Sequence, residues 1–151
     1  MKLLITVLAF SVGFLMFSEG TSKVEVTESL EVQAYLIANL VQAECTNCTE
    51  EDIDYITFTV MNRKSHKKFP STVLQVINQP NQFASLNRKI EMGVLCNPYV
   101  YKRVLRNLKL KNIPNVLFFI STNCTSKNCQ KIINNRREVF RTVNHIYFKE
   151  Q

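Results

Sequence analysis

An amphipathic stretch that ends in a glutamate is the feature that most constrains how this chain folds. Leu36, Leu40 and Glu44 are spaced four residues apart, so an α-helix places them on one side. The spacing therefore predicts that Glu44 ends a buried helix face, beside apolar side chains that disfavour its charged form. We expect this carboxyl to have a raised pKa and to donate a proton near neutral pH. The predicted stripe consists of Val32, Leu36, Leu40, Ala43 and Glu44.

A second helix is predicted directly after a short turn. Thr49 can cap its first turn, and Asp52 lies three residues later, where its carboxylate can bond back to the cap. The two helices should form a hairpin with Glu44 near its corner. The inward stripe of the second helix is expected to consist of Ile53, Ile56 and Val60.

The rest of the chain predicts two more helices and a small sheet. Ser71 can cap a short third helix, and Asn97–Pro98 is a cap followed by a proline in the first turn, which starts a fourth. The apolar run 116–120 reads as a buried strand, and 144–148 as its partner. We therefore expect an α+β fold that is mainly helical, with a small antiparallel sheet late in the chain.

The first twenty residues have the pattern of an export signal. Lys2 precedes the largely apolar run 3–17, and the small residues Ser18 and Gly20 stand where a signal peptidase requires them. The alternative is an uncleaved membrane anchor, for which the apolar run is short. We expect a signal peptide at 1–20, one domain at 21–151, and an exported protein that meets the membrane only through this signal.

The charge balance favours an anionic partner. The chain has 19 Lys and Arg residues against 12 Asp and Glu residues, a net charge of +7, and loss of residues 1–20 removes one charge of each sign. Such a domain suits nucleic acid, a membrane surface or an acidic wall polymer. We predict no nucleic-acid partner, because the chain has no nucleic-acid-binding motif and no run of interleaved basic and aromatic residues. We expect a monomer.

Five cysteines follow the predicted signal, and in an exported chain some should form disulfides, with one thiol left over. The spacing leaves the pairing open, although Cys124 and Cys129 could close their own loop. The alternative is a zinc site made by two cysteine pairs, which the wider spacing of the second pair disfavours. A thioredoxin-like site is disfavoured because no βαβ pattern surrounds the first pair. The cysteines are Cys45, Cys48, Cys96, Cys124 and Cys129.

The middle of the chain carries a recognisable series: Glu44, then Asn62-Arg63, then a Phe-Pro-x-Thr-Val-x-x-Val-Ile run from 69 to 77, then Gln82-Phe83. In this order it resembles the cell wall hydrolase family that includes the spore cortex-lytic enzymes of germination. The segment 144–148, Asn-His-Ile-Tyr-Phe, is similar to the closing motif of that family. The chain departs from the family at 45–48, where Cys-Thr-Asn-Cys replaces the usual Ala-Arg-Gly-Glu.

The resemblance implies a lysozyme-like fold and a specific reaction. The expected substrate is the glycan strand of peptidoglycan, cleaved between N-acetylmuramic acid and N-acetylglucosamine by lytic transglycosylation, which leaves a 1,6-anhydromuramic end. By resemblance Glu44 is the general acid and base, and the reaction uses no metal and no organic cofactor. The alternatives are a muramidase-type hydrolase with the same acid and a non-catalytic secreted module that binds the wall.

The acidic residues themselves agree with a single catalytic carboxyl. Hydrolysis of a glycoside uses two carboxylates across the bond, whereas attack by the sugar's own C6 hydroxyl uses one protein acid that later acts as the base. The other acids near Glu44 are assigned to a structural role, as favourable charges at a helix N-terminus. They are Glu50, Glu51, Asp52 and Asp54.

Four residues are predicted to bind substrate. Gln82 and Phe83 pair an amide with an aromatic ring, which suits an N-acetyl sugar, and His145 and Tyr147 share one face of a predicted strand. Asn62 and Arg63 are expected to be a structural pair that closes the helical hairpin. A further alternative is a peptidase in which the Cys45 thiol attacks with His145 as its base.

Overall fold

The computed structural model describes residues 28–80, 82–83 and 96–151. The predicted signal at 1–20 lies outside these residues. The described helices are α1 (Leu30–Glu44), α2 (Glu50–Ser65), α3 (Val73–Ile77), α5 (Pro98–Asn107) and α6 (Lys127–Asn135), and the strands are β1 (Phe118–Ser121), β2 (Arg137–Arg141) and β3 (His145–Lys149).

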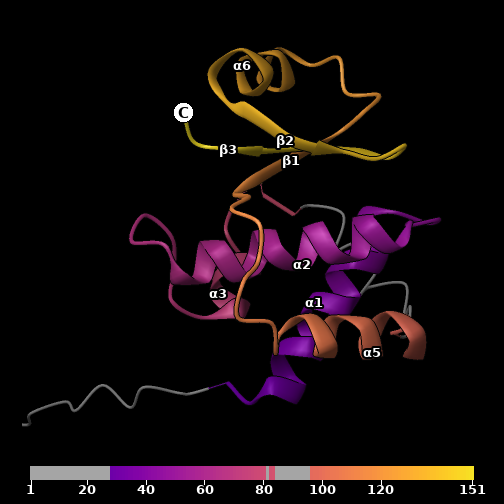
Figure 1. The fold of residues 1–151 in the computed structure, drawn as a ribbon. Coiled ribbons are helices and arrows are strands. Elements are labelled where there is room, and N and C mark those ends of the chain that lie inside the picture. Colours follow the sequence, from indigo (N-terminus) through magenta and orange to yellow (C-terminus); the bar gives the residue numbers. More distant parts are fainter. Residues whose placement is uncertain (1–27, 81, 84–95) are drawn as a thin grey trace, which may run out of the picture.

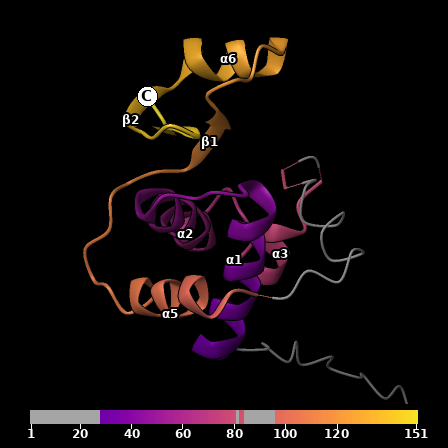
Figure 2. The same cartoon turned by 90° about the vertical axis from the view of Figure 1, so that its right-hand side faces the viewer.

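The elements are stacked in layers, with helices on both sides of the sheet. Helices α1, α2, α3 and α5 form one group, the sheet lies above α2, and α6 covers the far face of the sheet (Figures 1 and 2). Strand β3 is central, in the order β1-β3-β2, and both pairings are antiparallel. The predicted class, a mainly helical α+β fold with a small antiparallel sheet, is confirmed.

Local capping explains where the helices begin. Thr49 and Asp52 form the predicted capping box at α2, and the Asn97 side chain accepts from the backbone N–H of Tyr99 at the start of α5. Helix α3 differs from the prediction: Thr72 is its cap, not Ser71, and the Thr72 hydroxyl accepts from the Gln75 N–H. Serine and threonine are both good caps, so only the packing of α3 decides between these neighbours.

Helix α1 has a wider buried face than the sequence stripe predicted. Val32 was expected to face inward, but its side chain is 49% exposed, and Leu36 is only partly buried. The helix packs against three neighbours, α2, α3 and α5. Its buried face is therefore broader than the predicted stripe and is rotated away from Val32. Glu44 is half-buried at its C-terminal end, as predicted. The buried residues are Gln33, Ala34, Ile37, Ala38, Leu40, Val41 and Ala43.

Strand β3 is buried on both faces because two hydrophobic clusters meet at the sheet. Tyr147 packs into the main core with the helical group, whereas Ile146 and Phe148 pack against α6 around Ile120 and Cys129. Sequence patterning did not predict β2 or α6. Both elements are short and present largely exposed polar side chains, so they contain too few apolar residues for a reliable prediction.

Asn62 and Arg63 join the helices to the sheet. The Asn62 amide donates to the carbonyls of Pro114 and Val116, at 2.8 and 2.9 Å, and the Arg63 Nε donates to the carbonyl of Leu117 at 2.7 Å. Their expected role in closing the α1–α2 hairpin was therefore wrong. Instead they tie α2 to the segment that leads into β1.

The cysteines form two short-range disulfides, Cys45–Cys48 and Cys124–Cys129, and Cys96 is a free thiol. The four-thiolate zinc alternative is excluded, because each pair is bonded within itself. One bridge closes the turn after Glu44. The other closes the loop between β1 and α6, beside the smaller hydrophobic cluster.

We expect the bridge beside the smaller cluster to support the sheet. Replacing Cys124 and Cys129 by alanine frees the loop in the unfolded chain and should lower the free energy of unfolding by about 2 kcal/mol. Urea denaturation of the two proteins measures this difference. Cys96→Ala serves as a control that leaves both bridges intact, and an equal loss in the control would contradict the expectation.

Candidate active site

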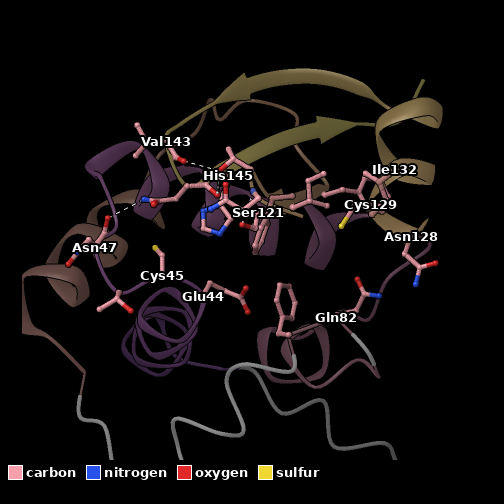
Figure 3. A pocket seen from close by; sticks show the side chains of 18 of the residues that line it. Glu44, Cys45, Asn47, Gln82, Ser121, Asn128, Cys129, Ile132, Val143 and His145 are labelled. Carbon is pink, nitrogen blue, oxygen red and sulfur yellow. Dashed lines mark hydrogen bonds between the residues drawn. The ribbon is translucent and has the colours of Figure 1, made fainter. Parts of the chain in front are cut away.

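A pocket of about 750 Å³ opens between the end of α1 and the helix-facing side of the sheet. Glu44 and the turn after it form one wall, and Ser121 of β1 with His145 of β3 forms the opposite wall (Figure 3). Because these residues come from opposite ends of the domain, the pocket exists only when the sheet is seated on the helices.

Glu44 is the only acidic residue among the described residues that line this pocket. It is the last residue of α1, and its carboxyl group points into the middle of the pocket, below His145 (Figure 3). The Cys45–Cys48 disulfide fixes the turn that follows it. The helix and the turn therefore hold one half-buried carboxyl at the centre of a concave surface.

Gln82 and Phe83 also line the pocket, as the sequence predicted for a substrate-binding pair. Gln82 is exposed, and in Figure 3 it lies at the opposite side of the pocket from Asn47. Phe83 is 5% exposed and packs in the main core while one side of it borders the pocket. The amide is thus accessible to a ligand, and the ring offers an apolar contact area.

Arg63 brings a cation to the pocket wall. Its guanidinium lies 5.1 Å from the ring centre of Phe83 and 5.6 Å from that of Phe118. Burial lowers its pKa to about 10, so it stays protonated at neutral pH. Among the described residues, its Nη1 has no hydrogen-bond partner. This side chain therefore keeps a buried positive charge at the pocket wall, which the sequence analysis did not anticipate.

Asp52 is the second residue whose part in the site the sequence did not predict, because its capping-box position gave it a structural role only. Its side chain is fully buried and lies at the junction of α2 with the β2–β3 turn. It accepts hydrogen bonds from Thr142 Oγ1 (2.5 Å), Asn144 Nδ2 (2.6 Å) and Tyr147 Oη (2.9 Å). His145 Nδ1 lies 3.2 Å from the same carboxylate.

The hydrogen bonds keep Asp52 ionised. Burial alone would raise the pKa of this carboxyl, but the bonds from Thr142, Asn144, His145 and Tyr147 outweigh burial and lower the pKa to about 2. The closing motif 144–148 thus supplies three donors to a single buried acceptor. The polar residues spaced along this strand were the sequence signal for a buried acceptor beside it, and that acceptor is Asp52.

His145 and Tyr147 share one face of β3 but have different access to the pocket. His145 is buried and lines the pocket, whereas Tyr147 has no exposed surface and does not line it. Burial raises the pKa of the Tyr147 hydroxyl, and the negative charges of Asp52 and Glu44 add to this effect. Tyr147 therefore lies behind the pocket wall, close enough to Glu44 to experience its charge.

One group of potential metal ligands comes together in the described residues. Ligand atoms of Cys45, Asp52 and His145 all lie within 4.8 Å of one another. The Cys45 sulfur is bonded to Cys48, and the Asp52 oxygens already accept several hydrogen bonds, so these groups do not suit a resident metal. The same disulfide argues against the peptidase alternative, because Cys45 has no thiolate with which to attack.

Comparison with known families decides what kind of protein carries this pocket. Residues 54–148, well over half of the chain, match the family described as Cell Wall Hydrolase. The chain belongs to the cell wall hydrolase family. The match starts at Asp54, so it includes Gln82, Phe83, His145 and Tyr147 but not Glu44 or Asp52.

Two solved structures share the fold of this cell wall hydrolase. The catalytic domain of the germination-specific lytic transglycosylase SleB from Bacillus anthracis is 23% identical, with a TM-score of 0.65 over 83% of this chain and 98% of that one. The catalytic domain of the Bacillus cereus SleB protein is 22% identical, with a TM-score of 0.68 over 87% and 99%. Comparison with curated protein sequences gives no match.

We expect the Asp52 carboxylate to make this cell wall hydrolase sensitive to acid. Its pKa is about 2 in the folded protein against an ordinary value of 3.8, so its contribution is complete above pH 4 and is lost as the pH falls toward 2. The corresponding loss is about 2 kcal/mol. Urea denaturation between pH 7 and pH 2 measures it.

Asp52→Asn should remove this part of the pH dependence and lower stability at pH 7 by a similar amount or more, because it leaves buried donors poorly paired. Glu51→Gln is the matched control, since Glu51 lies in the same helical turn but is exposed. Equal stability of Asp52→Asn and the wild type at pH 7 would contradict the role assigned to Asp52.

Proposed function

We propose that this protein is a lytic transglycosylase that cleaves the peptidoglycan glycan strand between N-acetylmuramic acid and N-acetylglucosamine. The observation that carries the proposal is the single carboxyl of Glu44, which points into a pocket that the described residues line with no other acid. The SleB catalytic domain from Bacillus anthracis, which has the same fold, is a lytic transglycosylase, and this supports the same reaction class.

The pocket favours intramolecular attack over direct hydrolysis. A hydrolase needs a second carboxylate to activate water or to attack the sugar. Asp52 is the other buried acid near the pocket, but it does not line it, and its oxygens are occupied by donors from the strand and the turn. A nucleophile carried by the substrate itself removes the need for that second group.

Glu44 then performs two proton transfers. In its protonated form it donates to the glycosidic oxygen while the bond from that oxygen to C1 of N-acetylmuramic acid breaks. The resulting carboxylate accepts the proton of the C6 hydroxyl as the C6 oxygen bonds to C1. The products are a 1,6-anhydromuramic end and a free hydroxyl on the released sugar, and Glu44 is again protonated.

The other lining residues position the sugars. Gln82 offers an amide to an N-acetyl group, Phe83 offers an apolar surface, and His145 faces the sugar beside Glu44. Tyr147 acts from behind the wall by bonding Asp52, so it supports the site without touching substrate. No metal or organic cofactor takes part in this mechanism.

The site of action follows from the substrate. A cell wall hydrolase acts outside the cytoplasm, and the export signal at residues 1–20 would deliver it to the periplasm, the wall or the medium. None of the helices in the described part of the chain is long and apolar enough to cross a membrane. We propose that the domain at 21–151 acts there as a monomer.

Glu44→Gln should lower the rate of peptidoglycan cleavage by about a hundredfold to ten-thousandfold, because the amide cannot donate or accept the proton. Mass spectrometry of the released muropeptides provides the measurement. The wild type should yield anhydromuramic ends. Reducing ends in their place would identify a muramidase, and full activity of Glu44→Gln would overturn the assignment.

Gln82→Ala should raise KM by about threefold to tenfold with a smaller effect on kcat, since it removes one hydrogen bond to the sugar. Gln75→Ala is the matched control, because Gln75 is exposed on α3 and does not line the pocket. An unchanged KM for Gln82→Ala would place the sugar away from this side of the pocket.

A further inference from the structure

We propose that Asp52 fixes the tautomer of His145, so that the second ring nitrogen accepts a hydrogen bond from a hydroxyl or N–H group of the sugar bound beside Glu44. Asp52 is then a positioning residue and His145 the group that contacts substrate. The identity of the ligand rests on the proposed function, whereas the tautomer follows from the protein alone.

The tautomer follows from hydrogen-bond chemistry. An ionised carboxylate only accepts hydrogen bonds, so the His145 Nδ1 that lies 3.2 Å from Asp52 Oδ1 must carry the proton. A neutral imidazole has one N–H group, and its other nitrogen is therefore an acceptor. The chemical class of the partner is thus a donor, as sugar hydroxyls and N-acetyl N–H groups are.

The surroundings of Asp52 hold this arrangement in place. Thr142, Asn144 and Tyr147 donate to the same carboxylate, which prevents it from turning away from the histidine. On its other side the His145 ring meets the Phe119 ring edge to face, with the ring centres 5.3 Å apart. The imidazole is therefore oriented before any ligand arrives, which reduces the cost of binding.

The second ring nitrogen, Nε2, is available to a ligand. Within the part of the chain that the structure describes, no hydrogen-bond partner is found for it, although the ring lines the pocket. In Figure 3 the ring stands over the Glu44 carboxyl. A sugar placed for proton transfer with Glu44 would therefore present its polar groups to this nitrogen.

His145→Asn separates this role from a purely structural one. The asparagine amide can take the place of Nδ1 and donate to Asp52, but no atom replaces Nε2. We expect stability close to that of the wild type and a loss of at least tenfold in kcat/KM on purified peptidoglycan, carried mainly by KM. His66→Asn is the control, since the only other histidine lies at the end of α2 outside the pocket, and it should keep full activity.

Nitrogen NMR of the imidazole rings tests the tautomer directly and needs no substitution at His145. In the wild type without ligand, and in the Glu44→Gln protein used for glycan binding, His145 should show a protonated Nδ1 and a bare Nε2. Soluble glycan strands from peptidoglycan should shift the Nε2 signal and leave His66 unchanged. A protonated Nε2 with a bare Nδ1, or no shift with saturating glycan, would overturn the proposal.

The outcomes also distinguish this inference from the proposed function. If the wild type cleaves peptidoglycan, Glu44→Gln is inactive, and a stable His145→Asn keeps full activity, the role of His145 fails and the transglycosylase survives. If the wild type gives no glycan cleavage, the proposed function fails, and the sugar is no longer supported as the ligand of His145. The tautomer is then judged by the NMR result alone.

Discussion

The buried carboxylate of Asp52 is the interaction on which the site depends. It caps α2 through Thr49 and also accepts hydrogen bonds from the β2–β3 turn and from β3. A buried charge is stable only when it is well paired, so Asp52 favours the arrangement in which the helix and the strand meet at this point. The same contact brings the His145 wall of the pocket over Glu44.

Two further connections fix the same junction from other directions. Asn62 and Arg63 bind carbonyls of the segment before β1, and the Cys45–Cys48 bridge closes the turn after Glu44. Arg63 also borders the pocket, so one side chain links the fold to the site. Because the pocket lies at this junction, residues that hold the two layers together also shape its walls.

Membership of the cell wall hydrolase family and the geometry of the pocket answer different questions. The family match covers 54–148 and identifies the class of enzyme, while Glu44 lies before that match and its proposed role rests on its position in the pocket. The proposal of glycan cleavage by a single protein acid is compatible with both. The division of roles among Glu44, His145 and Asp52 then follows from which carboxyl faces the pocket and which is enclosed by donors.

The sequence by itself determined the helical hairpin, the caps of α2 and α5, the pairing of β1 with β3 and the place of Glu44 at the end of a buried face, because these follow from local spacing and capping chemistry. Only the tertiary structure decided that Val32 faces solvent, that the cysteines pair locally, and that Asp52 is a buried acceptor. Asp52 and Tyr147 are 95 residues apart. The local sequence around Asp52 predicts the helix cap. It does not predict the contact with β3 and the turn before it, whose side chains donate the remaining hydrogen bonds to the carboxylate.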